Sequence, residues 1–403
     1  MKTTCFQNPR AERGPYPEAL AAVLSPAQGE AFGRWLAPWP RLNSEATPLV
    51  ALPGQAEALG LGALWLKDEG RRSPLGSFKA LGAPVALVAE VLRRHPAWDG
   101  AAVLQGRYAA ALGNFTVISA TDGNHGRALA AAATDAGCRC VIVLHAEVSE
   151  ERAQAIAELG AEVQRIAGNY DDSVAEAARL AHAEGWQVIS DTSYAGYEQV
   201  PGDVMQGYSR IAAEALAQTP EGVTHVVLQG GVGGLAAGVI SEFWGRLGPE
   251  RPTFLVVEPA QADCLLQSAK LGRAAAATGA VDSVMAGLAC GEASPLAWRF
   301  LEHSVDAFLT IKDEAAVAAM RRLAAGSTRE PPQVVGECGA AGLAALAGLS
   351  TGDRQALGLN EFASVLLINT EGATAPTVYA SLVGASAAAV AARRDQWQPR
   401  LGP

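Results

Sequence analysis

The stretch Trp65-Leu66-Lys67-Asp68-Glu69, followed by Gly76-Ser77-Phe78-Lys79-Ala80-Leu81-Gly82, places a lysine between a short apolar strand and an Ala-rich helix. A helix N-terminus and a neighbouring aromatic ring both disfavour the ammonium form of such a lysine, through the helix dipole and desolvation. The neutral amine is the form that attacks a carbonyl. Lys79 is therefore a candidate for a Schiff base with a cofactor. On this stretch alone a solvated helix-end lysine is the better interpretation. The choice between the two interpretations therefore depends on motifs elsewhere in the chain.

Length and composition narrow the class of protein. The chain has 403 residues, 49% of them hydrophobic and 18% charged, which is enough for two domains with large cores. Its net charge of −10, without a basic run, argues against nucleic acid as a partner. The sequence shows no signal-like segment and no apolar run long enough to span a membrane, so we expect the cytosol. The cysteines form no CxxC pair and the histidines no HExxH motif, so no metal site is expected.

Short β-rich runs alternate with helical stretches over most of the chain, which predicts an α/β fold with parallel sheets. Residues 1–50 are expected to form an arm with a helix over Pro17–Trp35, and the Ala-rich run to Arg394 a closing helix. Ligands of parallel sheets bind at the carboxyl ends of the strands. Five polar or glycine-rich segments are expected there: residues 120–126, 191–197, 230–234, 258 and 369–372.

The turn Ser119–Gly126 joins a strand to a helix and contains Asp122 and Asn124. The free N–H groups of the helix start can hold a substrate carboxylate, while Asn124 binds a cofactor oxygen. An Asx-rich turn that only caps the helix is the alternative, which the position at the sheet edge makes less favourable. Asp122 and Asp191 are candidate acids or bases, although each alone is more often a cap or turn residue.

The run Gly230-Gly231-Val232-Gly233-Gly234 follows an apolar strand and suits a phosphate bound at the next helix N-terminus. A flexible turn without a ligand is about equally favoured on this run alone. Gly231-x-Gly233-x-x-Ala236, with Glu258 ending the next strand, also fits a dinucleotide fingerprint. A nicotinamide or flavin enzyme therefore stays open, although that fingerprint gives no role to Lys79 or Asn124.

Three further residues have a functional and a simpler interpretation. Thr370 is placed to hydrogen-bond a ring nitrogen, but a satisfied turn hydroxyl is the better interpretation from the residue alone. Cys264 and Cys290 can form a bridge near the site, but two small buried apolar residues are favoured.

Several of these motifs together resemble a known family. Residues 76–82, the word Ala120-Thr121-Asp122-Gly123-Asn124-His125-Gly126 and residues 230–235 resemble the fold-type II pyridoxal-phosphate enzymes, the tryptophan-synthase β-like group. Residues 168–172, 191–198, 204–208, 285–292 and 367–372 resemble, within it, the diaminopropionate ammonia-lyases. The similarity runs from about residue 45 to 380.

The resemblance implies two open, twisted, mostly parallel sheets flanked by helices, with the active site between two domains. We expect residues 1–85 and 220–403 to form a large cofactor-binding domain and residues 86–219 a small one. The implied cofactor is pyridoxal 5′-phosphate, and the implied assembly is a homodimer. The implied reaction is α,β-elimination of D- and L-2,3-diaminopropionate to pyruvate and ammonia.

The resemblance also assigns roles residue by residue. Lys79, Asp122 and Asp191 are expected to be catalytic: Lys79 as Schiff-base lysine and base, Asp122 as base for the opposite enantiomer, and either aspartate as donor to the leaving amine. The remaining residues expected to bind the cofactor are Phe78, Asn124, Gly230, Gly231, Val232, Gly233, Gly234 and Thr370. Those expected to bind substrate are Ser119, Ala120, Thr121, Asp122, Tyr170 and Asp191. Cys264 and Cys290 match a cysteine pair near the site of this family.

The sequence departs from the family in two places, and other activities stay open. Ala373 and Ala375 stand where aspartates are more common, and Arg71-Arg72-Ser73-Pro74 before the lysine is unusual; either departure can signal a shifted substrate. The same motifs serve serine or threonine dehydratases and hydroxyaspartate ammonia-lyases. A nicotinamide-dependent oxidoreductase and a cofactor-binding protein without turnover are the alternatives from other classes.

Overall fold

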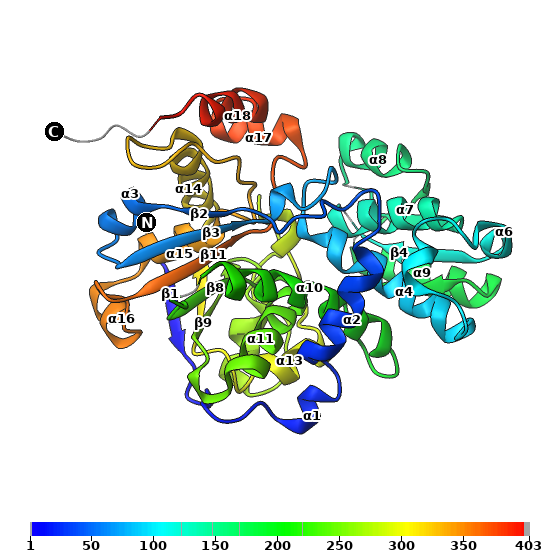
Figure 1. The fold of residues 1–403 in the computed structure, drawn as a ribbon, viewed down its shortest axis with the longest axis horizontal. Helices are drawn as coiled ribbons and strands as arrows, with labels where there is room; N and C mark the ends of the chain where they lie inside the picture. The colour runs from blue at the N-terminus through cyan, green and yellow to red at the C-terminus, as the bar shows by residue number, and fades with distance from the viewer. Residues whose placement is uncertain (1, 122, 147, 169, 220, 399–403) are drawn as a thin grey trace.

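The computed structural model describes residues 2–398 except 122, 147, 169 and 220, and it contains two sheets (Figure 1). The larger sheet has parallel inner strands and one antiparallel strand at each edge. Its order is β1 (Thr4–Gln7), β10 (Ala307–Ile311), β9 (Thr253–Pro259), β8 (His225–Gln229), β11 (Ser364–Asn369), β3 (Ala63–Asp68) and β2 (Leu49–Ala51).

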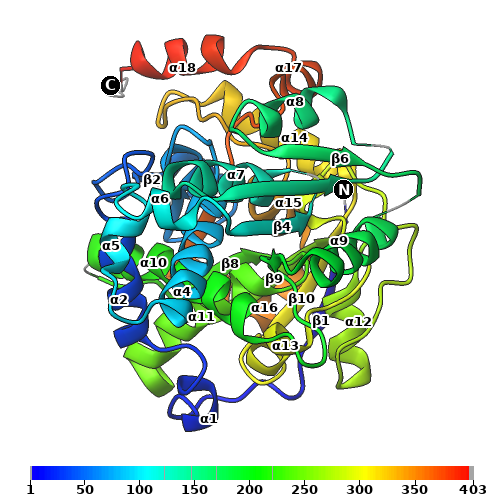
Figure 2. The ribbon, with the colours of Figure 1, turned by 90° about the vertical axis from the view of Figure 1, so that its right-hand side faces the viewer.

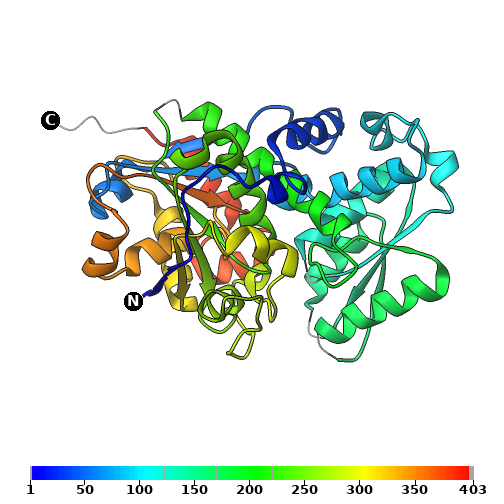
Figure 3. The ribbon, with the colours of Figure 1, turned by 90° about the horizontal axis from the view of Figure 1, so that it is seen from below.

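The smaller sheet is parallel throughout and lies in the other lobe of the molecule, where Figures 2 and 3 show it from the side and from below. Its order is β6 (Glu162–Arg165), β5 (Arg139–Leu144), β4 (Thr116–Ala120) and β7 (Gln187–Val188). The expected α/β fold with two mostly parallel sheets is confirmed. The division into domains at residues 85 and 219 stays a prediction.

Helices follow most strands and cover the sheets. The α-helices are α1 (Glu18–Ala21), α2 (Pro26–Leu36), α3 (Pro53–Ala58), α4 (Ala83–Arg94), α5 (Gly100–Val103), α6 (Ala109–Leu112), α7 (Asn124–Ala136), α8 (Glu150–Ala157), α9 (Tyr170–Glu184), α10 (Gln199–Gln218), α11 (Gly234–Leu247), α12 (Cys264–Leu271), α13 (Pro295–Leu301), α14 (Asp313–Ala325), α15 (Ala341–Gly348), α16 (Thr351–Ala356), α17 (Pro376–Val383) and α18 (Ala387–Asp395). The short 3-10 helices are η1 (Glu69–Arg71), η2 (Phe78–Leu81), η3 (Gly248–Glu250) and η4 (Ala286–Leu288).

Strand β8 shows why the larger sheet is buried on both faces. Successive side chains of a strand point to opposite faces. Val226 and Leu228 belong to one hydrophobic core with α10 and α11, whereas Val227 belongs to a second core with α14 and α15. Continuous apolar runs such as this one are typical of parallel strands covered by helices.

One expectation about the N-terminal arm needs correction. The single helix expected over Pro17–Trp35 is wrong, because α1 and α2 are separate. Ser25 caps α2 by accepting a hydrogen bond from the Gln28 N–H at 3.3 Å, and Pro26 begins the helix, so the chain starts a new helix there. The arm also contributes β1, whose pairing with β10 is long-range and leaves no local signal.

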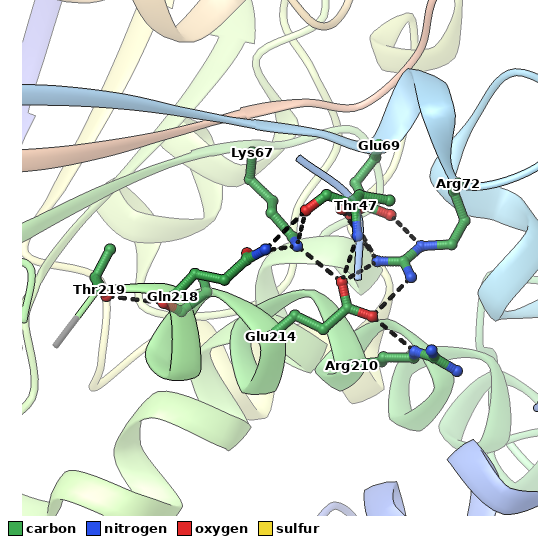
Figure 4. A network of polar contacts seen from close by, with 9 residues as sticks. Thr47, Lys67, Glu69, Arg72, Arg210, Glu214, Gln218 and Thr219 are labelled. Carbon is green, nitrogen blue, oxygen red and sulfur yellow. Dashed lines mark hydrogen bonds and ion pairs between the residues drawn. The ribbon is translucent and has the colours of Figure 1, made fainter. Parts of the chain in front are cut away.

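A buried polar network fixes the segment before Lys79 to α10 (Figure 4). The amine of Lys67, at the end of β3, donates to the Thr47 carbonyl, Glu214 and Gln218, each at 2.8 Å. The fully buried Arg72 forms paired hydrogen bonds with the carboxylates of Glu69 and Glu214, at 2.7–2.8 Å. Arg72, noted above as unusual, therefore lies in this network and not in a substrate site.

We expect the Glu214→Leu variant to lose roughly 3 kcal/mol of unfolding free energy, because Lys67 and Arg72 both lose this carboxylate in a dry environment. Urea unfolding followed by circular dichroism measures the loss. The matched control is Glu176→Gln, which breaks an exposed pair with Arg179 on α9 and leaves the unfolding midpoint unchanged. Equal midpoints for the two variants would show that the network adds nothing to stability.

Candidate active site between the carboxyl ends of the two sheets

An ion pair between Lys79 and Asp191 joins the two sheets at their carboxyl ends. Lys79 lies in η2, shortly after β3 of the larger sheet, and Asp191 follows β7 of the smaller one. Their side chains are 20% and 22% exposed, so solvent reaches both. The ring of His125, in the first turn of α7, lies beside the pair, with Nδ1 at 3.8 Å from Asp191 Oδ2. The structure thus brings together two of the three residues expected to be catalytic.

The charge state of Lys79 differs from the one expected from sequence. Burial by itself lowers the pKa of Lys79, but the carboxylate of Asp191 outweighs burial and raises the pKa above its ordinary value. The expected preference for the neutral amine is therefore wrong, because sequence reasoning included the desolvation and not the partner 112 residues away. Lys79 also lies in η2, one turn before α4 begins.

The same pair changes the expectation for Asp191. Burial would raise the pKa of its carboxyl, but Lys79 and then His125 lower it below the usual range. Asp191 is thus held as a carboxylate, which disfavours it as the donor to the leaving amine. The rings of Phe78 and Tyr208 complete the surroundings of the Lys79 amine, with centroids at 5.2 and 5.8 Å.

Asn124 and the loop after β11 form a second contact between the sheets. The Asn124 side-chain amide donates to Glu371, whose carboxylate also accepts from the Cys338 N–H at 3.3 Å and the Thr374 hydroxyl at 3.4 Å. The Phe78 N–H donates to the Thr370 carbonyl at 3.0 Å, which fixes this loop to the lysine segment. The sequence analysis placed Glu371 in the strand-end segment 369–372 but assigned it no role of its own.

The glycine run forms the turn between β8 and α11. Gly231 and Gly233 have φ values of 59° and 100°, and the helix start has no side-chain cap. Its first N–H groups are therefore available to an anion. A Cβ atom at Gly231 would stand 3.3 Å from the Gly287 carbonyl oxygen, so a side chain there would require a small shift of this neighbour in addition to the unfavourable φ.

Glu258 has a structural role that removes the dinucleotide interpretation. Its fully buried carboxyl group accepts hydrogen bonds from the Leu265 and Leu266 N–H groups, both at 2.8 Å, and thereby caps α12. Burial raises its pKa to about 8. A carboxyl group that is fully buried and caps a helix is not placed to bind a ribose hydroxyl. Nearby, the structure records no disulfide between Cys264 and Cys290, and Cys264 Sγ lies 3.4 Å from the Gly231 carbonyl oxygen.

The residues expected to bind substrate lie mostly at the end of β4. Ser119 and Ala120 end the strand, and the Thr121 hydroxyl accepts from the Gly123 N–H at 3.4 Å. Asp122 lies outside the described residues. Tyr170 begins α9, 38% exposed, and its place near a substrate stays a prediction.

These residues fit pyridoxal phosphate. Thr370 Oγ1, at the end of β11, and Ser119 Oγ, at the end of β4, are buried without a hydrogen-bond partner among the described residues. Such orphaned hydroxyls indicate polar ligand atoms nearby. The two hydroxyls provide partners for a ring and a carboxylate. The uncapped start of α11, after the glycine run, provides a partner for a phosphate, and the Lys79 amine provides one for an aldehyde. The described part of the chain contains no group of three or more potential metal ligands, and none of its helices is long and apolar enough to cross a membrane.

Comparison with known proteins identifies the class. A family model described as pyridoxal-phosphate dependent enzyme matches residues 41–371, so the chain belongs to this family and its cofactor is pyridoxal 5′-phosphate. The fold-type II architecture expected from the sequence is confirmed.

Particular relatives narrow the resemblance. The chain is 38% identical over 354 residues to the diaminopropionate ammonia-lyase of Escherichia coli K12, covering 86% of this chain and 89% of that protein. Crystal structures of the Escherichia coli enzyme superpose with TM-scores of 0.85 for the selenomethionine holo form and 0.84 for its complex with an aminoacrylate–pyridoxal-phosphate azomethine intermediate. Both are 33% identical and cover 95% of this chain and 96% and 97% of theirs. A probable D-serine dehydratase of Paracidovorax citrulli is 27% identical over 73% of this chain and 70% of its own length.

The raised pKa of Lys79 gives a direct test of the ion pair. In protein stripped of cofactor, we expect Asp191→Asn to lower the pKa of the Lys79 amine, because burial remains and the compensating carboxylate is lost. At pH 8–9 an amine-directed reagent should then label Lys79 faster in the variant than in the wild type. Peptide mass spectrometry over a pH series measures the rates, with exposed Lys270 of the same sample as reference. Unchanged labelling of Lys79 would contradict the assigned cause.

Proposed function

We propose that this protein catalyses the α,β-elimination of 2,3-diaminopropionate, in both configurations, to pyruvate and ammonia. The observation that carries the proposal is the ion pair of the Lys79 amine with Asp191, next to the orphaned Thr370 hydroxyl in the loop that binds the Phe78 N–H. The similarity to the Escherichia coli diaminopropionate ammonia-lyase over most of both chains supports this substrate. The dehydratases that match have lower identity, which makes dehydration of serine or threonine the less favoured alternative.

Different residues bind different parts of the cofactor and the substrate. When bound, pyridoxal phosphate supplies an aldehyde that joins amines covalently and a conjugated ring that spreads negative charge. In our proposal the N–H groups after Gly230–Gly234 bind the phosphate, Thr370 Oγ1 the ring nitrogen, and Asn124 a cofactor oxygen. Ser119, Ala120 and Thr121 hold the substrate carboxylate at the start of α7.

Proton transfer is the second task of these residues. Lys79 Nζ accepts the Cα proton on one face, and Asp191 stabilises the proton at Nζ through their ion pair. Asp122 is proposed as the base on the opposite face, which accounts for turnover of both isomers. Because Asp191 is held as a carboxylate, Asp122 is also the remaining candidate to protonate the leaving β-amine.

The assembly and the compartment of the protein belong to the same proposal. We propose a homodimer in the cytosol, supported by the resemblance to the family and by the composition of the chain. Size-exclusion chromatography with light scattering measures the oligomeric state.

The substrate is tested by product stoichiometry. Elimination of the β-amine followed by hydrolysis releases two ammonia molecules for each pyruvate, whereas serine dehydration releases one. We expect a ratio of two with both D- and L-2,3-diaminopropionate, and kcat/KM at least about tenfold lower with serine. Enzymatic assays of pyruvate and ammonia measure both quantities.

Asp122→Asn is the matched variant in this assay, and it should lose far more kcat on the D isomer than on the L isomer. Faster turnover of serine by the wild type would favour a dehydratase. A coloured protein that releases no pyruvate from either substrate would indicate a cofactor-binding protein without turnover.

A further inference from the structure

His125 has a buried ring nitrogen that faces the ion pair of Lys79 and Asp191. The side chain of His125 is 3% exposed, and its Nδ1 has no hydrogen-bond partner among the described residues. Asp191 Oδ2 lies 3.8 Å from Nδ1, a distance too long for a hydrogen bond. The same Oδ2 atom accepts the hydrogen bond of the Lys79 amine. Nδ1 therefore points to the carboxylate that binds the candidate Schiff-base lysine.

The other ring nitrogen fixes the tautomer of His125. Nε2 lies 2.9 Å from the Ile189 carbonyl oxygen, which can only accept, so Nε2 carries the proton. Burial lowers the pKa of His125 below its ordinary value, although the nearby Asp191 acts in the opposite direction. A neutral imidazole has a single N–H group, so Nδ1 presents a lone pair to Asp191.

Nδ1 and the Asp191 carboxylate are thus two acceptors that face each other. Neither can donate to the other, and a buried acceptor without a donor is costly, so the pair is best satisfied by a cation close to both. In this structure the Lys79 ammonium lies beside them. When Lys79 is joined to the cofactor aldehyde, the two acceptors are open to a second ammonium group.

The position of the two acceptors suits a substituent on Cβ of the substrate. His125 lies in the first turn of α7, the helix start where the proposed function places the substrate α-carboxylate. Asp191 binds the amine of Lys79, which the substrate α-amine replaces on the cofactor. A substrate held between α7 and Lys79 therefore carries its β-substituent close to both acceptors.

We propose that His125 Nδ1 and the Asp191 carboxylate form a subsite that binds the β-amine of the substrate as an ammonium ion. The inference deepens the proposed function and rests on it, because it takes the substrate and its orientation from it. An ammonium ion has three N–H donors and can donate to both acceptors at once, whereas a hydroxyl group has one donor and no charge. The subsite therefore favours β-amino over β-hydroxy amino acids.

The subsite also accounts for the proton of the leaving amine. A β-amine bound as an ammonium ion already carries this proton, so Asp122 is needed only as a base. When the Cβ–N bond breaks, its electron pair stays on nitrogen and NH₃ leaves. The electrons of the Cα–H bond form the Cα–Cβ double bond, and the Cα proton goes to Lys79 or Asp122, as proposed above.

The compounds 2-methyl-2,3-diaminopropionate and 2-methylserine are matched probes, because a methyl group replaces the Cα hydrogen in both and prevents elimination. They differ at Cβ, where one carries an ammonium group and the other a hydroxyl group. Spectral titration of the holoenzyme at neutral pH gives Kd for each probe. We expect the wild type to bind the diamino probe at least about tenfold more tightly, the ratio that one charge-assisted hydrogen bond supplies.

Two variants test the two acceptors separately. His125→Phe keeps a ring and removes the acceptor, so the preference should fall at least about threefold with little change in Kd for 2-methylserine. Asp191→Asn keeps the shape and removes the charge, so its preference should fall to about one. This variant keeps the test available if His125→Phe does not fold.

His225→Phe is the matched control. His225 is also buried, and its Nε2 lies 2.7 Å from the Leu357 carbonyl oxygen, but it begins β8, at the end of the strand away from the glycine run. This variant should keep the full preference for the diamino probe.

Equal affinity of the wild type for the two probes would overturn the subsite, as would a preference that survives in His125→Phe or in Asp191→Asn. The product stoichiometry tests the reaction separately. Two ammonia molecules for each pyruvate, without a preference between the probes, would remove the subsite and leave the proposed function. A preference between the probes without release of pyruvate would do the reverse.

Discussion

The contact between Lys79 and Asp191 is the constraint on which the site depends. Lys79 follows a strand of the larger sheet and Asp191 a strand of the smaller one, so the pair exists only when the two sheets present their carboxyl ends to each other. The contact of Asn124 with Glu371 crosses between the sheets in the same way. Parallel sheets collect polar strand ends at one edge. Two such edges facing each other give a site whose acids, amides and hydroxyls come from distant parts of the sequence.

The buried network behind the lysine segment supports this geometry. Lys67 and Arg72 flank η1 and both bind Glu214 of α10, the helix that also carries Tyr208 beside the Lys79 amine. A buried ion pair contributes little net stability but strongly disfavours arrangements that separate its charges. The network therefore restricts the path of the chain from β3 to Lys79. The network also distinguishes the buried Lys67 from Lys79, since the amine of Lys67 already has three acceptors.

The sequence predicted the parts of the structure that have a local signal. The alternation of strands and helices, the polar strand ends at 120–126, 230–234 and 369–372, and the lysine after β3 are all of this kind. The parts that it missed depend on long-range contacts. The pKa of Lys79 is raised, not lowered, by an aspartate 112 residues away, and Glu258 caps α12 although its spacing fits a dinucleotide site. Glu371 gained its significance only from the residues around it.

The central claim is that Lys79 is the lysine joined to the cofactor, and one measurement tests it directly. The chain has only five lysines: Lys2, Lys67, Lys79, Lys270 and Lys312. Borohydride reduction of the freshly purified holoenzyme fixes the cofactor to its lysine, and peptide mass spectrometry then locates the added mass. Our account predicts the modification on the peptide that contains Lys79 and on no other. Modification of Lys67 or of another lysine, with Lys79 unmodified, would contradict it.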